Sequence, residues 1–431
     1  MALYAFDGTW NKPDDTPNDG HDTNTNVYRF AQAYARCHND DGQTLQHWYR
    51  PGVGTRFGKV GRIIGGFTGA GGRQRVSEML ELCQAEFEAG DRTVDIVGFS
   101  RGAALALHFA NKLTDGVKVN KQLLKADSIR FLGLWDTVPS FGIPGAILDW
   151  ANDINIGWEL DLPHHVSYCA HALARHERRQ AFNVHRLDPK HRNENVHEVW
   201  FRGSHADIGG GNENHKRNAI TLLWMMEQAR KAGIPFTDTQ IEVVRQQQDL
   251  EAEINTNDMV GEKIDRPFYE GDRMHPSAAR RLAVGESKEL SIDSRQLFDF
   301  SGLMMEKDDQ YLFRPDASSR WSDSGIECDP SGWPEDLSQS NSLFSRLRER
   351  FLESKTIGLL RRVRSANWFE ICACPGFDDR EAFPVGKNQH TTTPWVCPQD
   401  GPLTFFANDS DFPNQYGNNE GSIRIQVKRV A

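Results

Sequence analysis

The sequence predicts an α/β domain with a mostly parallel sheet, followed by a smaller antiparallel β-sandwich domain. In the first part of the chain, short apolar runs alternate with stretches that repeat apolar residues at helical spacing. This alternation is typical of a parallel sheet covered by helices on both faces. From about residue 285, short apolar strands are separated by turns rich in Gly, Pro, Asn and Asp, which favours a sandwich. The predicted domains are residues 1–284 and 285–431.

Length and composition fit two folded domains. The chain has 431 residues, of which 38% are hydrophobic and 26% charged, and this length typically gives two or three domains. A net charge of −10 disfavours non-specific nucleic-acid binding, so no nucleic-acid partner is expected. The seven cysteines are odd in number and predict free thiols in a protein made in a reducing cytoplasm. We find neither a signal peptide nor an apolar run of about 18 residues that would span a membrane.

The predicted elements of the first domain follow from apolar periodicity. The segment 139–165 interrupts the alternation with an apolar stretch punctuated by Gly and Pro. It is either a lid or membrane-contacting loop, or ordinary core packing. In chain order we expect strand 3–6, helix 73–88, strand 93–99, helix 101–113, strand 128–135, helix 172–182, strand 197–203 and helix 219–233.

The second domain is expected to consist of short strands with one insertion. Residues 335–366 are polar and partly helical in pattern, and they include an Arg-rich patch. A solvated helix face explains that patch more simply than contact with anionic lipid headgroups. The expected strands are 288–293, 310–315, 368–373, 403–409 and 422–430.

A G-x-S-x-G pattern is the sharpest chemical signal. It runs from Gly98 to Gly102 with Ser100 at its centre, between a predicted strand and a helix rich in small residues. This context is typical of the strained turn that exposes a nucleophilic serine above the sheet of an α/β-hydrolase. The simpler alternative is a Gly-rich turn that carries a surface serine.

A nucleophilic serine needs a base and an acid that orients it. Asp136 and His205 each follow a predicted strand at its carboxyl end, where open α/β sheets place their sites. Asp136 could instead cap a helix or a turn, and His205 could be a solvated loop residue. His197 and His215 are the alternative bases, and Asp207 is the alternative acid.

Backbone N–H groups would form the oxyanion hole. One would come from Arg101, directly after the nucleophile, and another from Gly8 or Thr9 in the loop after the first strand. The same loop could equally be a plain turn, with Asp7 bonding its own backbone.

Ordered strings across the first domain resemble a known family. The chain is similar to the catalytic domain of the first family of type VI secretion lipase effectors. The resemblance implies a Ser–Asp–His esterase or phospholipase that needs no cofactor, with Ser100, Asp136 and His205 as the triad. The strings are FDGTWN (6–11), TNVYRF (25–30), GVGT (52–55), GFSRGAA (98–104), LWDTV (134–138), HALARHERRQAF (171–182), VWFRGSHADIGGG (199–211) and MHPSAARRL (274–282).

That resemblance also implies a biological setting. The substrate would be a bacterial glycerophospholipid, and the protein would leave the producer's cytoplasm by type VI secretion and act at a target-cell membrane. A secretion spike component and an immunity protein would be its partners. The competing hypothesis is an esterase on soluble or glycan-linked esters, which the sandwich would target to sugars.

The tail of the chain carries oxygen-rich side chains on a tight loop. Asp409, Asn418 and Asn419 suit a hard cation such as calcium, although a Gly/Asn hairpin turn explains the composition more simply. Residues 287–431 resemble the calcium-dependent, galactose-specific jelly-roll lectins (LecA type), through NDS…YGNNEGSIRIQV and RWSDSG. The resemblance implies calcium at Asp409, Gln415, Asn418 and Asn419, completed by a carbohydrate. Gln415 stands where that family has threonine, so a calcium-free docking surface is the alternative.

Overall fold

The computed structural model divides into two compact units, Met1–Arg266 and Pro267–Ala431. None of the helices in the described ranges is long and apolar enough to cross a membrane. The described residues are 1–8, 23–39, 41–52, 69–139, 158–179, 182–191, 193–212, 215–250, 252, 254, 266, 272–323, 326–333, 361–377, 379–387, 389–410, 416 and 419–431.

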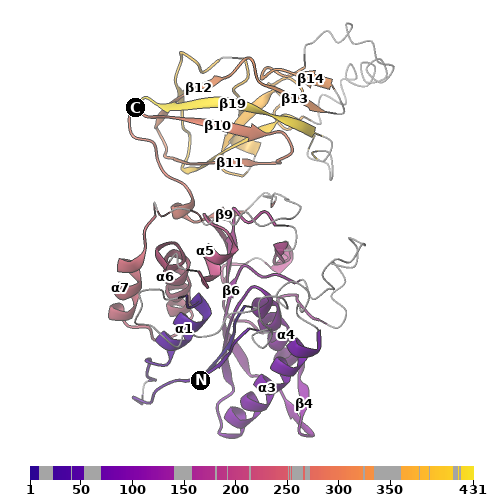
Figure 1. The fold of residues 1–431 in the computed structure, drawn as a ribbon, viewed down its shortest axis with the longest axis vertical. Helices are drawn as coiled ribbons and strands as arrows, with labels where there is room; N and C mark the ends of the chain where they lie inside the picture. Colours follow the sequence, from indigo (N-terminus) through magenta and orange to yellow (C-terminus); the bar gives the residue numbers. More distant parts are fainter. Residues whose placement is uncertain are drawn as a thin grey trace. The chain divides into compact units, whose positions relative to one another are not determined.

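A sheet whose strands in the first unit have the order β2-β1-β3-β6-β7-β8 dominates this part of the chain (Figure 1). The neighbouring strands from β2 to β8 all pair in parallel, as the sequence predicts. These strands are β1 (Ala2–Phe6), β2 (Gln46–Arg50), β3 (Thr93–Phe99), β6 (Ser128–Trp135), β7 (Cys169–Ala174) and β8 (Val196–Phe201). The two-residue strand β9 (Arg273–Met274) falls within the residues of the second unit.

Helices cover both faces of this sheet (Figure 1). Along β1, Tyr4 and Phe6 enter a core shared with α3 and α4, whereas Leu3 and Ala5 enter a core shared with α1, α6 and α7. The alternation of side chains along a strand therefore supplies two hydrophobic layers. A short hairpin, β4 (Val117–Val119) and β5 (Gln122–Leu124), pairs separately. The helices are α1 (Asn26–Tyr34), α3 (Gly69–Glu88), α4 (Arg101–Asp115), α5 (His205–Gly209), α6 (His215–Lys231) and α7 (Asp238–Gln247).

One predicted element is wrong. Residues 172–182 were expected to form a helix, but β7 extends through Ala174 and the chain then bends without forming a helix at the described residues up to Arg179. Every residue of β7 is buried, and β7 pairs on both sides, with β6 and with β8. Burial between two parallel strands thus overrides the helical preference of alanine and leucine.

The second unit consists of antiparallel sheets. One has the order β14-β13-β19-β12-β17 with β10 also paired to β19, and the other has the order β11-β18-β15-β16. Side chains from both sheets, among them Phe313, Trp321 and Phe405, share one hydrophobic core. The strands are β10 (Ser287–Asp293), β11 (Asp299–Met305), β12 (Gln310–Pro315), β13 (Arg320–Asp323), β14 (Ile326–Cys328), β15 (Ile371–Pro375), β16 (Phe383–Pro384), β17 (Trp395–Val396), β18 (Gly401–Ala407) and β19 (Asn419–Arg429).

Candidate active site

Residues selected from the sequence gather at one edge of the parallel sheet. Asp7 follows β1, Ser100 follows β3, Asp136 follows β6, and His205 opens α5 shortly after β8. Since these strands run parallel, their carboxyl ends lie at the same edge. Open α/β sheets place their binding and catalytic residues at this edge.

Ser100 lies on a sharp turn between β3 and α4. Its φ angle is 58° and its ψ angle −127°, a conformation that residues with a side chain rarely adopt. The flanking glycines allow this turn: a Cβ on Gly98 would lie 2.6 Å from the Gly102 carbonyl oxygen. A Cβ on Gly102 would meet the carbonyl oxygens of Phe6 and Asp7. The two glycines of the pattern are therefore required by close backbone approach, as at a nucleophile elbow.

Asp136 and His205 are hydrogen-bonded to each other. His205 Nδ1 lies 2.5 Å from Asp136 Oδ2, and both residues are buried. The His205 ring packs against two phenyl rings, with centroid distances of 4.6 Å to Phe99 and 4.8 Å to Phe182. Phe99 immediately precedes Ser100. The structure thus pairs the predicted acid and base, and it places the base against the neighbour of the predicted nucleophile.

The protonation states of this pair suit general-base chemistry. Burial opposes the charge on Asp136, but Arg266 and His205 outweigh it and hold the pKa of the carboxyl well below its usual value. Burial lowers the pKa of His205, against the opposing influence of Asp136 and Glu177. Both shifts favour a carboxylate beside a neutral imidazole, the pair that general-base catalysis by histidine requires.

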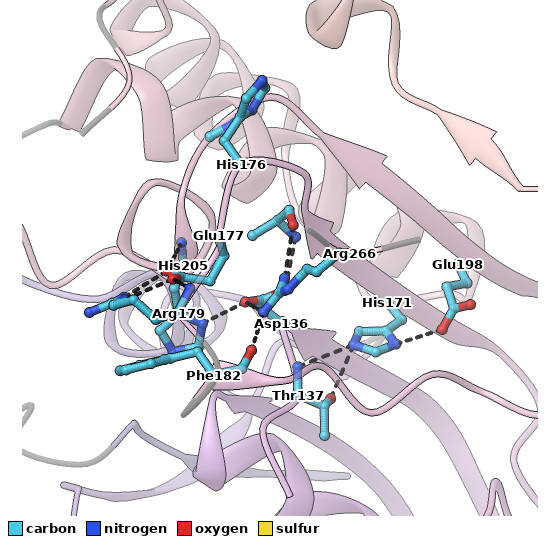
Figure 2. A network of polar contacts seen from close by, with 12 residues as sticks. Asp136, Thr137, His171, His176, Glu177, Arg179, Phe182, Glu198, His205 and Arg266 are labelled. Atoms are coloured by element: carbon cyan, nitrogen blue, oxygen red, sulfur yellow. Dashed lines mark hydrogen bonds and ion pairs between the residues drawn. The ribbon is translucent and has the colours of Figure 1, made fainter. Parts of the chain in front are cut away.

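Arg266 is a member of the site that the sequence analysis missed (Figure 2). Its Nη1 donates to Asp136 Oδ1 at 2.6 Å and its Nη2 to Asp136 Oδ2 at 3.1 Å. The same nitrogens donate to the carbonyl oxygens of Ala174 at 2.8 Å and Phe182 at 2.5 Å. Arg266 lies outside every string used in the sequence analysis, and a single arginine carries no local signal of its partner.

A second ion pair, between Glu177 and Arg179, contacts the backbone of the predicted base (Figure 2). Glu177 Oε2 accepts the backbone N–H of His205 at 3.2 Å. Arg179 holds that carboxylate with two side-chain bonds of 2.7 and 2.6 Å, and its guanidinium lies 3.7 Å from the ring centroid of Phe182. Glu177 lies within the string HALARHERRQAF (171–182), and the structure places its carboxylate at the backbone N–H of the predicted base.

A buried histidine network lies next to the acid (Figure 2). His171 Nε2 is 3.1 Å from Thr137 Oγ1, and Nδ1 is 3.1 Å from Glu198 Oε2. Arg186 donates to the other oxygen of Glu198 at 2.8 Å. Burial alone would raise the pKa of Glu198, but His171 and Arg186 lower it to about 2. Since Thr137 follows Asp136, these bonds fix the backbone immediately after the predicted acid.

The predicted oxyanion residues differ in their surroundings. Arg101 opens α4, so its N–H lies at a helix N-terminus, where partial positive charge gathers. The Gly8 N–H donates to Asp7 Oδ1 at 2.6 Å, so in this structure it is occupied within its own loop. Asp7 also accepts hydrogen bonds from Thr25 and Tyr49. Thr9 lies outside the described residues.

The alternative acid and bases occupy other positions. Asp207 Oδ2 accepts the Ser204 N–H at 2.9 Å and so caps the helix that begins at His205. His197 lies on β8 and packs 5.1 Å from the ring of Tyr168. His215 opens α6. The hydrogen bond to Asp136 is made by His205.

Several further predictions are only partly covered by the structure. Of the predicted calcium ligands, Asp409 and Asn419 are described and buried, whereas Gln415 and Asn418 lie outside the described residues. Most of the segment 139–165 lies outside them too, so its role as a lid stays a prediction.

A family model for the catalytic domain of Tle1-like phospholipase effectors of the type VI secretion system matches residues 3–122 and 114–228. Together these ranges cover more than half of the chain. The chain belongs to this family. Membership confirms the predicted resemblance to type VI secretion lipase effectors. No curated protein gives a significant match to this Tle1-like chain.

Three of the solved structures that are similar to this Tle1-like protein share 14–21% sequence identity with it. An uncharacterised protein from Pseudomonas aeruginosa is 21% identical with a TM-score of 0.41, covering 59% of this chain and 51% of that chain. The present chain thus spans about half the length of that protein. A Tle1 effector bound to the VgrG spike is 14% identical with a TM-score of 0.34, covering 99% and 68%. The EclA N-terminal domain, a PllA-like lectin, is 19% identical with a TM-score of 0.22, covering 33% and 94%.

Proposed function

We propose that this Tle1-like protein is a serine phospholipase that hydrolyses ester bonds of bacterial glycerophospholipids. The observation that carries the proposal is the hydrogen bond between Asp136 and His205, at the sheet edge that bears the Ser100 turn. Family membership supports a lipid substrate, and the geometry supports a Ser–His–Asp reaction through an acyl-enzyme.

Each step follows from the protonation states of the site. His205 Nε2 accepts the proton of Ser100 as the serine oxygen attacks the ester carbonyl carbon, and Asp136 stabilises the imidazolium. The Arg101 N–H donates to the oxyanion. Collapse expels the lysophospholipid alcohol, which takes the proton from His205. Water then attacks the acyl-enzyme with His205 again as base, which releases the fatty acid and restores Ser100.

The test is fatty-acid release from phosphatidylethanolamine–phosphatidylglycerol vesicles by wild type and Ser100→Ala. Removal of a triad serine costs about 10⁶ in kcat, so the variant should fold and be inactive. Ser291→Ala is the matched control, because Ser291 is exposed and lies on β10 in the second unit. Retention of a tenth of the activity by Ser100→Ala would contradict the assignment.

The substrate class needs its own comparison. If the protein does not hydrolyse the vesicles but Ser100 still reacts with a fluorophosphonate probe, the alternative is favoured, namely an esterase on soluble or glycan-linked esters. For the whole chain we propose type VI delivery, with a spike component and an immunity protein as partners. Co-purification of the chain with a type VI secretion spike protein tests this proposal, and failure to bind any spike component would contradict it.

We further propose that the second unit binds calcium through Asp409, Gln415, Asn418 and Asn419. A buried acceptor supports this: Asn419 Nδ2 donates to the Ser294 carbonyl, while Asn419 Oδ1 is buried with no hydrogen-bond partner among the residues that the structure describes. Such an oxygen suits a calcium ligand. The carbohydrate that the lectin resemblance implies would bind at the same place.

A further inference from the structure

Asp136 receives a donor at every acceptor position of its carboxylate. Oδ1 accepts the Ala174 N–H at 2.8 Å and Arg266 Nη1 at 2.6 Å, and Oδ2 accepts His205 Nδ1 and Arg266 Nη2. An ionised carboxylate offers about four lone-pair sites. Rotation of this side chain would therefore break bonds that nothing else replaces, so the direction in which Oδ2 faces the imidazole is fixed.

Arg266 also binds the backbone of two further segments, at Ala174 and at Phe182. Its two terminal nitrogens each make one bond to Asp136 and one to a carbonyl oxygen, of Ala174 or of Phe182. The Phe182 ring in turn packs edge-on against His205. Arg266, which is 4% exposed, thus completes a closed set of contacts that links Asp136, His205 and Phe182. A planar fork with fixed donors is suited to this task, whereas an ammonium is not.

We infer that Arg266 is a positioning residue of the active site. It fixes the Asp136 carboxylate in the orientation that faces His205, and its positive charge weakens the electrostatic effect of that carboxylate on the imidazole. The inference rests on the proposed function. It goes beyond that function by adding a cation to the Ser–His–Asp arrangement. In a triad without such a cation, the negative charge of the acid acts on the base without an opposing charge. Here the positive charge of Arg266 partly offsets it.

The charged groups around His205 determine how loss of the Arg266 charge would change the pKa of the base. Among the described residues, Asp136 faces the ring, Glu177 accepts its backbone N–H, Arg266 lies behind Asp136, and Arg179 is paired with Glu177. The rings of Phe99 and Phe182 contact the imidazole and carry no charge. Removal of the Arg266 charge leaves two carboxylates against one cation, so protonated His205 becomes more favourable.

The test is the pH dependence of kcat/KM for a neutral p-nitrophenyl ester with the full-length protein. The acidic limb reports the base of the free enzyme. Arg266→Gln should move it to higher pH by about one unit. Arg266→Lys keeps the charge but not the fork, so its acidic limb should stay with that of wild type while kcat falls about 100-fold. Arg130→Gln is the matched control, since it breaks an ion pair with the buried Asp95 toward the amino ends of β6 and β3, away from Asp136, and its limb should not move.

Each outcome supports or overturns the inference. An unshifted limb in a folded, fluorophosphonate-reactive Arg266→Gln would overturn it, and so would wild-type kcat in Arg266→Lys. If Arg266→Gln does not fold, the kcat of Arg266→Lys decides alone. Activity that survives in Ser100→Ala would instead overturn the proposed function. Activity that depends on Ser100, combined with an unshifted limb, would remove only the role of Arg266.

Discussion

Ser100 and Asp136 both have positive φ angles, of 58° and 43°. Such conformations cost on the order of 1–3 kcal/mol each and persist only where the surroundings enforce them. Here backbone bonds enforce them: the Ser100 N–H donates to Trp135 and the Asp136 N–H to Ala172, at 2.9 and 2.8 Å. The strained residues are the proposed nucleophile and acid, so the fold holds the reacting groups in place before substrate arrives.

The Gly102→Ala substitution should damage both stability and activity. The added methyl group would meet the carbonyl oxygens of Phe6 and Asp7, and backbone cannot move aside as a flexible side chain can. We expect a loss of about 1–3 kcal/mol in the free energy of unfolding, measured by urea denaturation, together with a large fall in kcat.

Gly233→Ala is the control for that substitution. Gly233 has a φ of 92° but open space around it, so the change should cost about 1 kcal/mol through backbone strain alone and leave kcat unchanged. Equal kcat in Gly102→Ala and wild type would show that the elbow tolerates a side chain, contrary to the close approach described above.

Asp7 should make the protein less stable as pH rises. Burial raises the pKa of Asp7 to about 6, above the value of about 4 in an unfolded chain. The folded state thus binds the proton more tightly, and this contribution to stability is present below about pH 4 and is lost as pH rises through about 6. The urea midpoint of unfolding should fall more between acidic and neutral pH in wild type than in Asp7→Asn. An equal fall in both would exclude the effect.

The proposed triad residues could be selected from the sequence because each stands beside a local signal. Ser100 lies in a five-residue pattern, and Asp136 and His205 each follow an apolar strand. Arg266 could not be selected, because its interaction with Asp136 joins positions 130 residues apart and arises only from packing.

At the scale of elements, helix α1 secures the turn that carries the base. Thr25 caps α1 through the Tyr28 N–H. Next to it, the buried Asn26 amide donates to the carbonyl oxygens of Ile208 and Asn218, both at 2.9 Å. Ile208 belongs to the short helix that begins at His205. A helix from the start of the chain therefore holds the element that presents the base.

Asn26→Ala should lower kcat as well as stability. Unmet carbonyl groups in the core cost about 1–3 kcal/mol, and a displaced His205 would slow the reaction about 100-fold. The control is Asn408→Ala in the second unit, where an equally buried asparagine bonds the backbone of Val363 and Asn367. Urea denaturation and vesicle hydrolysis should show that both variants are destabilised but that only Asn26→Ala loses kcat. A similar loss of kcat in both would contradict the link from α1 to the base.

Element prediction succeeded where the local pattern and the tertiary environment agree. The strands 93–99 and 128–135 have the predicted bounds, because buried parallel strands are predominantly apolar. The charged exceptions, Asp95 and Arg130, pair with each other. It failed for 172–182, where alanine and leucine indicated a helix although the segment begins in the middle of a sheet. Sequence periodicity does not report which neighbours a segment will find.

For the whole molecule, the sequence boundary between the two compact units falls between Arg266 and Pro267. The predicted domain boundary falls between residues 284 and 285. The α/β and antiparallel parts were predictable, because strand length and turn composition change along the chain. Galactose recognition stays a prediction, since it depends on individual side-chain positions rather than on sheet architecture.

Calcium should stabilise the second unit selectively. A ligand that binds only the folded state at 100 times its Kd adds about 2.7 kcal/mol, so calorimetry with calcium and with chelator should show one shifted transition. Asp409→Ala should abolish the shift, whereas Asp400→Ala should retain it, because Asp400 is exposed and bonds the Lys307 N–H. A shift that persists in Asp409→Ala would place any calcium elsewhere.

The position of Arg266 at the end of the first unit has a consequence for the order in which the protein is made. A ribosome that has translated as far as His205 has already supplied the serine, the acid and the base, but not the guanidinium that holds the acid in place. A growing chain therefore lacks a finished active site until its whole first unit has emerged.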